Sequence, residues 1–228
     1  MQRLRLFPLN TVLFPGAVLN LHVFEPRYRQ LVSECVEADE PFGVCMIREG
    51  DEAGDPDVMP YEVGTAARIT DMRPLGGGRY YLNTLGAKRF RIERVLGREP
   101  YLLAEVSEVA EDEPSDPKAL AELVAEIRDV FREYLRLVVE FSGMPFDIGL
   151  PDDPLEASFL IGDALQVADS MKQRLLELTN TEGRLTVELG FLRRLLPQLR
   201  ALLERKRDAS PGDRIEQERY YGKRFSLN

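Results

Sequence analysis

The segment FPLNTVLFPGAVLNLHVFEPRY, residues 7–28, sets the fold of the first part of the chain. Two apolar stretches meet at a Pro15–Gly16 corner, and the second alternates apolar and polar residues from Val18 to Val23. A period of two is typical of a strand that has one buried face. Pro26 suits the first position of a helix, since its missing N–H would be unpaired there in any case. The segment therefore predicts two strands followed by a helix that begins at Pro26.

Further strands and turns follow in the first half of the chain. Alternation recurs in Arg89–Glu93 and Leu103–Val109, and Gly76–Gly78 is typical of a hairpin turn. Several short strands joined by turns indicate a small β-barrel domain over residues 1–112, with one inserted helix. An apolar stripe with helical spacing predicts how that helix packs on the strands. The stripe consists of Tyr28, Leu31, Val32, Cys35 and Val36.

A charged, proline-bearing segment, EDEPSDP at 111–117, indicates a boundary between two domains. The pair Asp116–Pro117 suits the N-cap and first turn of a helix whose apolar spacing runs until Gly143. Residues 117–207 are therefore predicted to form a helical-bundle domain, with a C-terminal tail at 208–228. Together the two parts predict the α+β class, with a β-barrel first and an α-helical bundle second.

Capping sequences mark three further helices in the predicted bundle. The sequence DPLE from Asp153 forms a capping box, SMKQ from Ser170 repeats the pattern, and TNTE from Thr179 precedes a long leucine stripe. Pro197 lies inside that stripe, where it removes a backbone donor. We therefore expect the last helix to be kinked or split in two at Pro197.

The composition is that of an ordinary folded protein, and it narrows the classes of function. The chain has 228 residues, 44% of them hydrophobic and 30% charged, which suffices for one large domain or two modest ones. Thirty Lys and Arg against 39 Asp and Glu give a net charge of −9, which opposes binding to nucleic-acid phosphates. Nucleic acid is therefore not expected as a partner unless basic residues form a separate patch.

Motifs that would indicate catalysis or a metal site are missing from the sequence. His22 is the single histidine, neither a P-loop nor a GxSxG motif occurs, and Cys35 and Cys45 have no CxxC spacing. We expect His22 to be a hydrogen-bonded structural residue and the acidic clusters to cap helices. The sequence thus predicts no enzyme, no metal and no other cofactor. An enzyme acting on a small molecule in a cleft between the domains is the weakest alternative.

The cellular location is predicted from the N-terminal segment and the cysteines. Residues Leu6–Phe24 carry no formal charge over about the length of a membrane span, but Pro, Gly, Asn and His interrupt them. The segment also lacks the cleavage site of a signal peptide. Cys35 and Cys45 are typical of buried thiols in a reducing compartment. We expect a soluble cytoplasmic protein that makes no membrane contact.

A cluster of basic residues along one predicted strand leaves two interpretations open. With tyrosines nearby, it could form an RNA-binding surface of the kind that joins basic and aromatic side chains. The alternative, which we favour, is a solvated strand face whose charges are balanced by Glu93 and Glu99. The cluster spans Lys88–Arg98 and consists of Lys88, Arg89, Arg91, Arg94 and Arg98.

Several separated motifs resemble, in order and spacing, the N-terminal domain of Lon proteases. They are FPLNTVLFPG and FEPRY within residues 7–28, VGTAA at 63–67, GAKRFRI at 86–92, the strand Tyr101–Val109, and KQRLLELTNTEGRL at 172–185. The resemblance covers about residues 1–205. It implies a PUA-like β-barrel followed by a helical bundle, the part of Lon that engages protein substrates.

The resemblance also has a limit that shapes the expected function. Lon proteases continue into an ATPase module and a Ser-Lys peptidase module, whereas this sequence reaches Asn228 without a Walker motif. The chain is therefore identified as a member of the free-standing substrate-binding-domain proteins, and neither ATPase nor peptidase activity is expected of it.

The function that the resemblance implies is a non-enzymatic protein-binding module. Its expected partners are unfolded proteins or exposed hydrophobic protein segments, held in an apolar groove between barrel and bundle. Main-chain hydrogen bonds at a sheet edge would supply the sequence-independent part of such binding. Weak self-association into a homo-oligomer is left open. The candidate contact residues are Phe14, Pro15, Phe24, Arg27 and Tyr28.

Overall fold

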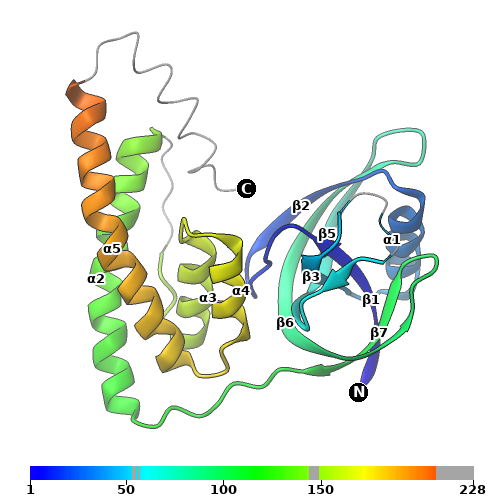
Figure 1. Ribbon diagram of the computed structural model, residues 1–228, viewed down its shortest axis with the longest axis horizontal. Coiled ribbons are helices and arrows are strands. Elements are labelled where there is room, and N and C mark those ends of the chain that lie inside the picture. The colour runs from blue at the N-terminus through cyan, green and yellow to red at the C-terminus, as the bar shows by residue number, and fades with distance from the viewer. Residues whose placement is uncertain (53–54, 56, 144–148, 209–228) are drawn as a thin grey trace. The chain divides into compact units, whose positions relative to one another are not determined.

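The computed structural model describes residues 1–52, 55, 57–143 and 149–208 (Figure 1). The chain divides into two compact units, and the first combines Met1–Glu111 with Ala168–Thr179. The second unit consists of Asp112–Val167 and the chain from Asn180 onward. Strands lie in the first unit and long helices in the second, so the predicted α+β class is confirmed. Apart from Asp208, the predicted tail at 208–228 lies outside the described residues.

The first unit is built on a ring of paired strands. Strand β1 pairs with β7, β7 with β6, β6 with β5, and β5 with β3, and a parallel pairing of β3 with β1 closes the ring. Strands β2 and β4 pair with this ring from outside it. The elements are β1 (Gln2–Leu9), β2 (Val18–Val23), α1 (Pro26–Ala38), β3 (Phe42–Glu49), β4 (Met59–Pro60), β5 (Val63–Pro74), β6 (Tyr80–Gly97), β7 (Leu102–Glu108) and α4 (Asp169–Glu177).

The predicted hairpin turn at Gly76–Gly78 is confirmed and joins β5 to β6. The N–H of Leu75 donates to the carbonyl of Arg79 at 2.9 Å, which closes the turn. All three glycines have positive φ, between 59° and 78°. Side chains other than glycine rarely adopt that conformation, so the triplet is required by the geometry of the turn.

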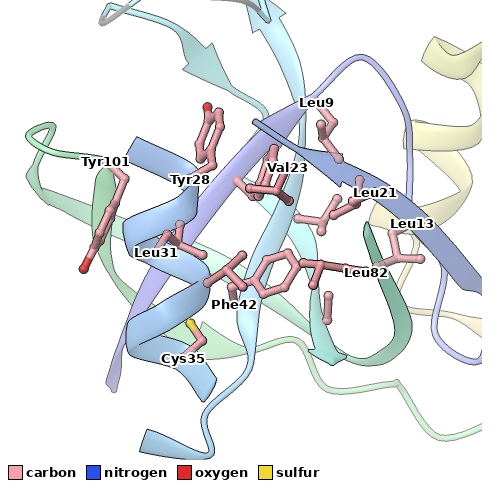
Figure 2. Packing of buried hydrophobic residues seen from close by; sticks show 14 residues of the cluster. Leu9, Leu13, Leu21, Val23, Tyr28, Leu31, Cys35, Phe42, Leu82 and Tyr101 are labelled. Carbon is pink, nitrogen blue, oxygen red and sulfur yellow. The ribbon is translucent and has the colours of Figure 1, made fainter. Parts of the chain in front are cut away.

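Helix α1 begins at Pro26 as predicted and covers the interior of the strand ring. Its buried side chains are those of the predicted stripe except Val36, which is 45% exposed. The Tyr28 ring stacks on Phe7 of β1 with ring centroids 3.9 Å apart. Figure 2 shows the resulting core, in which α1 contributes Tyr28, Leu31 and Cys35. The core members labelled there also include Leu9, Leu13, Leu21, Val23, Phe42, Leu82 and Tyr101.

The described residues of the second unit form three helices, and their predicted caps are largely confirmed. Asp116 accepts hydrogen bonds from the N–H groups of Lys118 and Ala119, and Asp153 accepts one from Glu156. Asn180 caps the last helix by accepting from the N–H of Gly183 at 2.6 Å. The helices are α2 (Pro117–Ser142), α3 (Pro154–Ala164) and α5 (Thr181–Asp208).

Helices α2 and α5 run parallel to each other as a long pair (Figure 1). Ion pairs join them at three places along their described length, and each links residues that lie 67 positions apart. The pairs repeat every seven residues along both helices, which is the spacing of charged positions that flank a coiled-coil seam. They are Glu126–Arg193, Glu133–Arg200 and Glu140–Arg207.

Of the two alternatives expected at Pro197, a split of the last helix into two is wrong. Helix α5 is continuous from Thr181 to Asp208 with Pro197 inside it. Pro197 lies on the exposed side of the helix, where water can satisfy the carbonyl that its missing N–H leaves free. Buried Leu192 and Leu199 hold the helix on either side of the proline.

Helix α4 belongs to the first unit, whereas the predicted boundary at 117–207 places it in the helical bundle. The amide of Gln173 donates to the carbonyl of Val63 in β5 at 3.0 Å. Arg89 of β6 donates to the carbonyls of Leu176 and Leu178 at the end of the helix. The cap expected at Ser170 is also wrong, because Ala168 is the N-cap and forms no side-chain cap hydrogen bond.

Candidate functional site

Exposed apolar side chains gather on one face of the first unit, around strand β2. Val18 is 57% exposed and Phe24 is 55% exposed, and exposed Tyr81 lies opposite His22 in the β2–β6 register. The His22 and Phe24 rings lie 5.7 Å apart, so both point to the same side of the strand. We call this surface the β2 face. It consists of the outward side chains of β2 and of the segments of β6 and β5 that continue the sheet: Val18, Asn20, His22, Phe24, Tyr81, Asn83, Leu85, Arg68, Asp71 and Arg73.

Strand β2 also presents an open sheet edge. Among the described residues, β6 is the one strand that pairs with it. The N–H of Gly86 donates to the carbonyl of Ala17 at 2.9 Å. Because hydrogen-bonded and non-hydrogen-bonded positions alternate along an antiparallel strand, the odd-numbered residues from Ala17 to Val23 direct their main-chain groups toward β6. The main-chain groups of Val18, Asn20 and His22 are therefore directed to the open edge. An extended chain could pair with them there.

The structure separates the predicted contact residues into core and surface. Phe14 has no exposed surface and Tyr28 is 4% exposed, so both belong to the core and neither is available to a partner. Their large aromatic side chains fill the interior of the strand ring, and their size is the reason that the sequence analysis selected them as contacts. Pro15 is half-buried in the turn before β2, and Phe24 lies on the β2 face. Of these four residues, Pro15 and Phe24 are thus the ones that reach the surface.

Arg27, the remaining predicted contact, is engaged within the unit. Its guanidinium pairs with Glu25 at 3.0 Å and donates to the carbonyls of Glu52 and Asp55. It also lies over the Tyr28 ring, 4.5 Å from the centroid. Burial raises the pKa of Tyr28 to about 12, which keeps this phenol neutral beneath the arginine. Arg27 therefore fixes the loop before β4 and contributes little free charge to the surface.

His22 is not the hydrogen-bonded structural residue that the sequence predicts. Its side chain is exposed on the β2 face and accepts or donates no hydrogen bond within the described part of the chain. The described residues also contain no cluster of three or more His, Cys, Asp or Glu side chains arranged to hold a metal ion. None of the described helices combines the length and apolar character needed to cross a membrane.

The basic strand is neutralised by partners that differ from the expected ones. Arg89 is buried and pairs with Glu111, while Glu93 accepts a hydrogen bond from Ser107 instead of balancing an arginine. Ion pairs with neighbouring strands and segments leave little free positive charge on this surface. The other partners are Glu108 for Lys88, Glu62 for Arg91, Glu105 for Arg94 and the carbonyl of Val58 for Arg98.

Sequence reasoning missed two parts of the β2 face. Phe24 was predicted as a contact, and the alternation from Val18 to Val23 places Val18 on the same side of the strand, so exposed Val18 could have been found as well. The contribution of Tyr81 could not, because it depends on pairing between residues 59 positions apart in the sequence, His22 and Tyr81. The open edge of β2 is likewise a property of the sheet order.

Comparison with known proteins relates the whole chain to one family. The sequence profile of the ATP-dependent protease La (LON) substrate-binding domain matches residues 3–194. Lon protease 2 of Myxococcus xanthus is 29% identical over 195 residues, which is 85% of this chain and 24% of that protein. A Lon protease of Anaeromyxobacter dehalogenans is 28% identical, over 84% of this chain and 23% of that protein. The chain thus spans about a quarter of the length of these curated relatives.

Solved structures agree with the profile. A Lon N-terminal domain protein from Xanthomonas campestris is 29% identical, and the match covers 83% of this chain and 98% of that one with a TM-score of 0.62. The N-terminal domain of a Mycobacterium avium complex Lon protease, 20% identical, shares the fold with the same TM-score over 84% of this chain and 98% of that one. Because the profile covers most of the sequence, the chain belongs to the ATP-dependent protease La (LON) substrate-binding domain family.

Proposed function

We propose that this chain binds unfolded proteins and exposed hydrophobic protein segments, and that the β2 face receives them. The family match supports a role in holding protein substrates. The observation that carries the proposal is the combination of an open strand edge with exposed Val18 and Phe24 beside it. The proposed contact thus lies on the first unit itself and needs no groove between the two units.

The expected binding mode is addition of an extended segment along β2. Main-chain groups of Val18, Asn20 and His22 would pair with the segment regardless of its sequence. Apolar side chains of the segment would pack on Phe24 and Tyr81, and burial of the exposed half of a phenylalanine contributes about 1 kcal/mol. Such a mode favours unfolded chains, because a folded protein rarely offers a free extended segment.

We further propose that the chain acts by binding alone, in the cytoplasm. The profile that it matches is that of a substrate-binding domain, and the activities of the full-length relatives belong to proteins about four times as long. Cys35 and Cys45 are free thiols buried in the first unit. Burial raises the pKa of Cys35 to about 11, which suits an unreactive thiol in a reducing compartment.

Serine substitutions at Phe24 and Val18 should weaken binding of an unfolded segment. The probe is a short fluorescein-labelled peptide with a Leu-Phe-Val-Tyr centre and Gly/Ser flanks, and its affinity is measured by fluorescence anisotropy. Phe24→Ser combined with Val18→Ser should raise its Kd by about tenfold or more, because the apolar area of the β2 face is lost. Val187→Ser is the matched control, since Val187 is a 42% exposed valine on α5 of the other unit. Equal weakening by the control, or no weakening by the double variant, would contradict the assignment of the site.

A proline at position 20 tests the open edge itself. Asn20→Pro removes a main-chain donor that is directed away from β6, at a position where an edge strand tolerates proline. We expect a Kd for the same peptide that is about fivefold higher, with the thermal unfolding temperature little changed. Asn20→Ser keeps the N–H and is the control. If both variants bind like the parent protein, strand addition along β2 is not the binding mode.

A further inference from the structure

We propose that the β2 face selects extended segments in which apolar residues are flanked by Asp or Glu. This inference rests on the proposed function of the same face and adds the chemistry of the preferred partner. It starts from a contrast in charge. The whole chain carries a net charge of −9, whereas the charged residues of the β2 face are Arg68, Arg73 and Asp71, and Arg79 lies in the adjoining turn between β5 and β6.

Arginines lie at both ends of the β2 face. Arg68 pairs in register with Leu85, which lies opposite Val18. At the other end, Arg73 lies opposite Tyr81, and Arg79 directly precedes Tyr80, the β6 residue that pairs with Val23. The residues between these ends are Asn20, Asn83 and Asp71, so the charges flank the face along the direction of β2.

The acidic residues around this surface do not cancel its positive charge. Asp71 is the one carboxylate among the outward residues of the β2 face, and Arg73 neutralises it in a 2.8 Å ion pair. Glu25, which follows Phe24, is held by Arg27. Among the described residues, Arg68 forms no ion pair, and the Arg79 side chain donates to the carbonyl of Gly76 in its own turn and to no carboxylate. Within that part of the chain, these two arginine charges therefore have no carboxylate partner.

The distance from these arginines to an added strand sets the size of the expected effect. Strands lie about 4.8 Å apart, so a segment paired with β2 would lie about 14 Å from the backbone of β5. Arg and Glu side chains extended from the two sides reach across much of that distance. The Debye length is about 8–10 Å at moderate salt, so the attraction acts chiefly as a field that steers and orients the segment. The preference should therefore be moderate and should depend strongly on ionic strength.

Three labelled peptides test the inference with the intact protein. They share the Leu-Phe-Val-Tyr centre and differ in their flanks, which are Asp/Glu, Gly/Ser or Lys. In 50 mM NaCl the acidic peptide should bind about fivefold tighter than the neutral one, and the lysine peptide should bind more weakly than the neutral one. In 500 mM NaCl the three affinities should converge. Arg68→Gln combined with Arg79→Gln should bring the acidic-to-neutral ratio close to one.

Arg132→Gln is the matched control, because it removes one exposed arginine from α2 in the other unit. It should leave the acidic-to-neutral ratio unchanged. Equal affinities for the acidic and lysine peptides at low salt, or an acidic preference that survives the double variant, overturn the inference but not the proposed function. Failure of the neutral peptide to bind at all overturns the proposed function as well. The two failures are therefore distinguishable.

Discussion

Replacing Arg89 by alanine should lower the free energy of unfolding of the first unit by about 3–5 kcal/mol. The guanidinium is buried and donates to the carbonyls of Leu176 and Leu178, at 2.5 and 2.7 Å, while it pairs with Glu111. Those two carbonyls lie at the C-terminal end of α4, where a cation also interacts favourably with the helix dipole. Removing the side chain leaves three acceptors without their donor in a region that water reaches poorly.

Lys88 provides the control for this substitution. It precedes Arg89 on the same strand, but its side chain is exposed and its ion pair with Glu108 is open to solvent. Lys88→Ala should change the free energy of unfolding by no more than about 0.5 kcal/mol. Urea unfolding at neutral pH, followed by circular dichroism, compares the two variants with the parent. A loss in Arg89→Ala no larger than that in Lys88→Ala would show that the buried arginine does not hold α4.

Glu188→Met should stabilise the second unit by about 1–3 kcal/mol at pH 8. Glu188 lies on α5 with no exposed surface, and neither carboxylate oxygen has a hydrogen-bond partner among the described residues. Burial raises the pKa of this carboxyl well above its ordinary value of 4.5, and the charge of Arg184 one turn earlier opposes that shift only in part. Methionine has a similar length and no polar atom to desolvate, so the penalty disappears.

The same substitution should change how stability depends on pH. In the unfolded chain the Glu188 carboxyl loses its proton near pH 4.5, whereas in the folded protein it keeps the proton to a higher pH. Between these two values the folded state binds more protons, so the free energy of unfolding falls as the pH rises. Glu188→Met should remove this slope, and the gain in stability should be small at pH 4.5 and larger at pH 8. The control Glu204→Met alters an exposed residue of α5 and should keep the slope of the parent. Parallel pH profiles for Glu188→Met and the parent would refute the prediction.

Local signals in the sequence were sufficient to predict the class of the fold and several helix starts. The N-caps at Asp116 and Asp153 depend on residues within one turn of the cap, and the start of α1 depends on Pro26 itself. The turn at Gly76–Gly78 likewise follows from three adjacent residues. Such features are visible because their physical cause lies within a few positions of the chain.

Features that depend on distant residues could not be predicted. Arg89 has the same local alternation as half-buried Arg91, and its burial follows from acceptors 87 and 89 positions later. The apolar side of α4 indicates that the helix is buried, but not that β5 and β6 bury it. At the candidate site, the same limit explains why Phe14 and Tyr28 were predicted as contacts. A large apolar ring looks alike in the sequence whether it fills a core or a binding surface.

The discontinuity of the first unit has a consequence for the order of events during synthesis. Arg89 is synthesised 89 residues before Leu178. At ribosomal rates of about 5–20 residues per second, the strands of the ring are therefore complete roughly 4–18 s before the end of α4 is synthesised. During that interval the buried guanidinium and the carbonyl of Val63 lack α4 as a partner. Helix α2 is likewise synthesised before α5, because each arginine of α5 that pairs with a glutamate of α2 lies 67 residues later in the chain. The nascent chain therefore exposes, for seconds, the kind of apolar surface that the finished protein is proposed to bind in others.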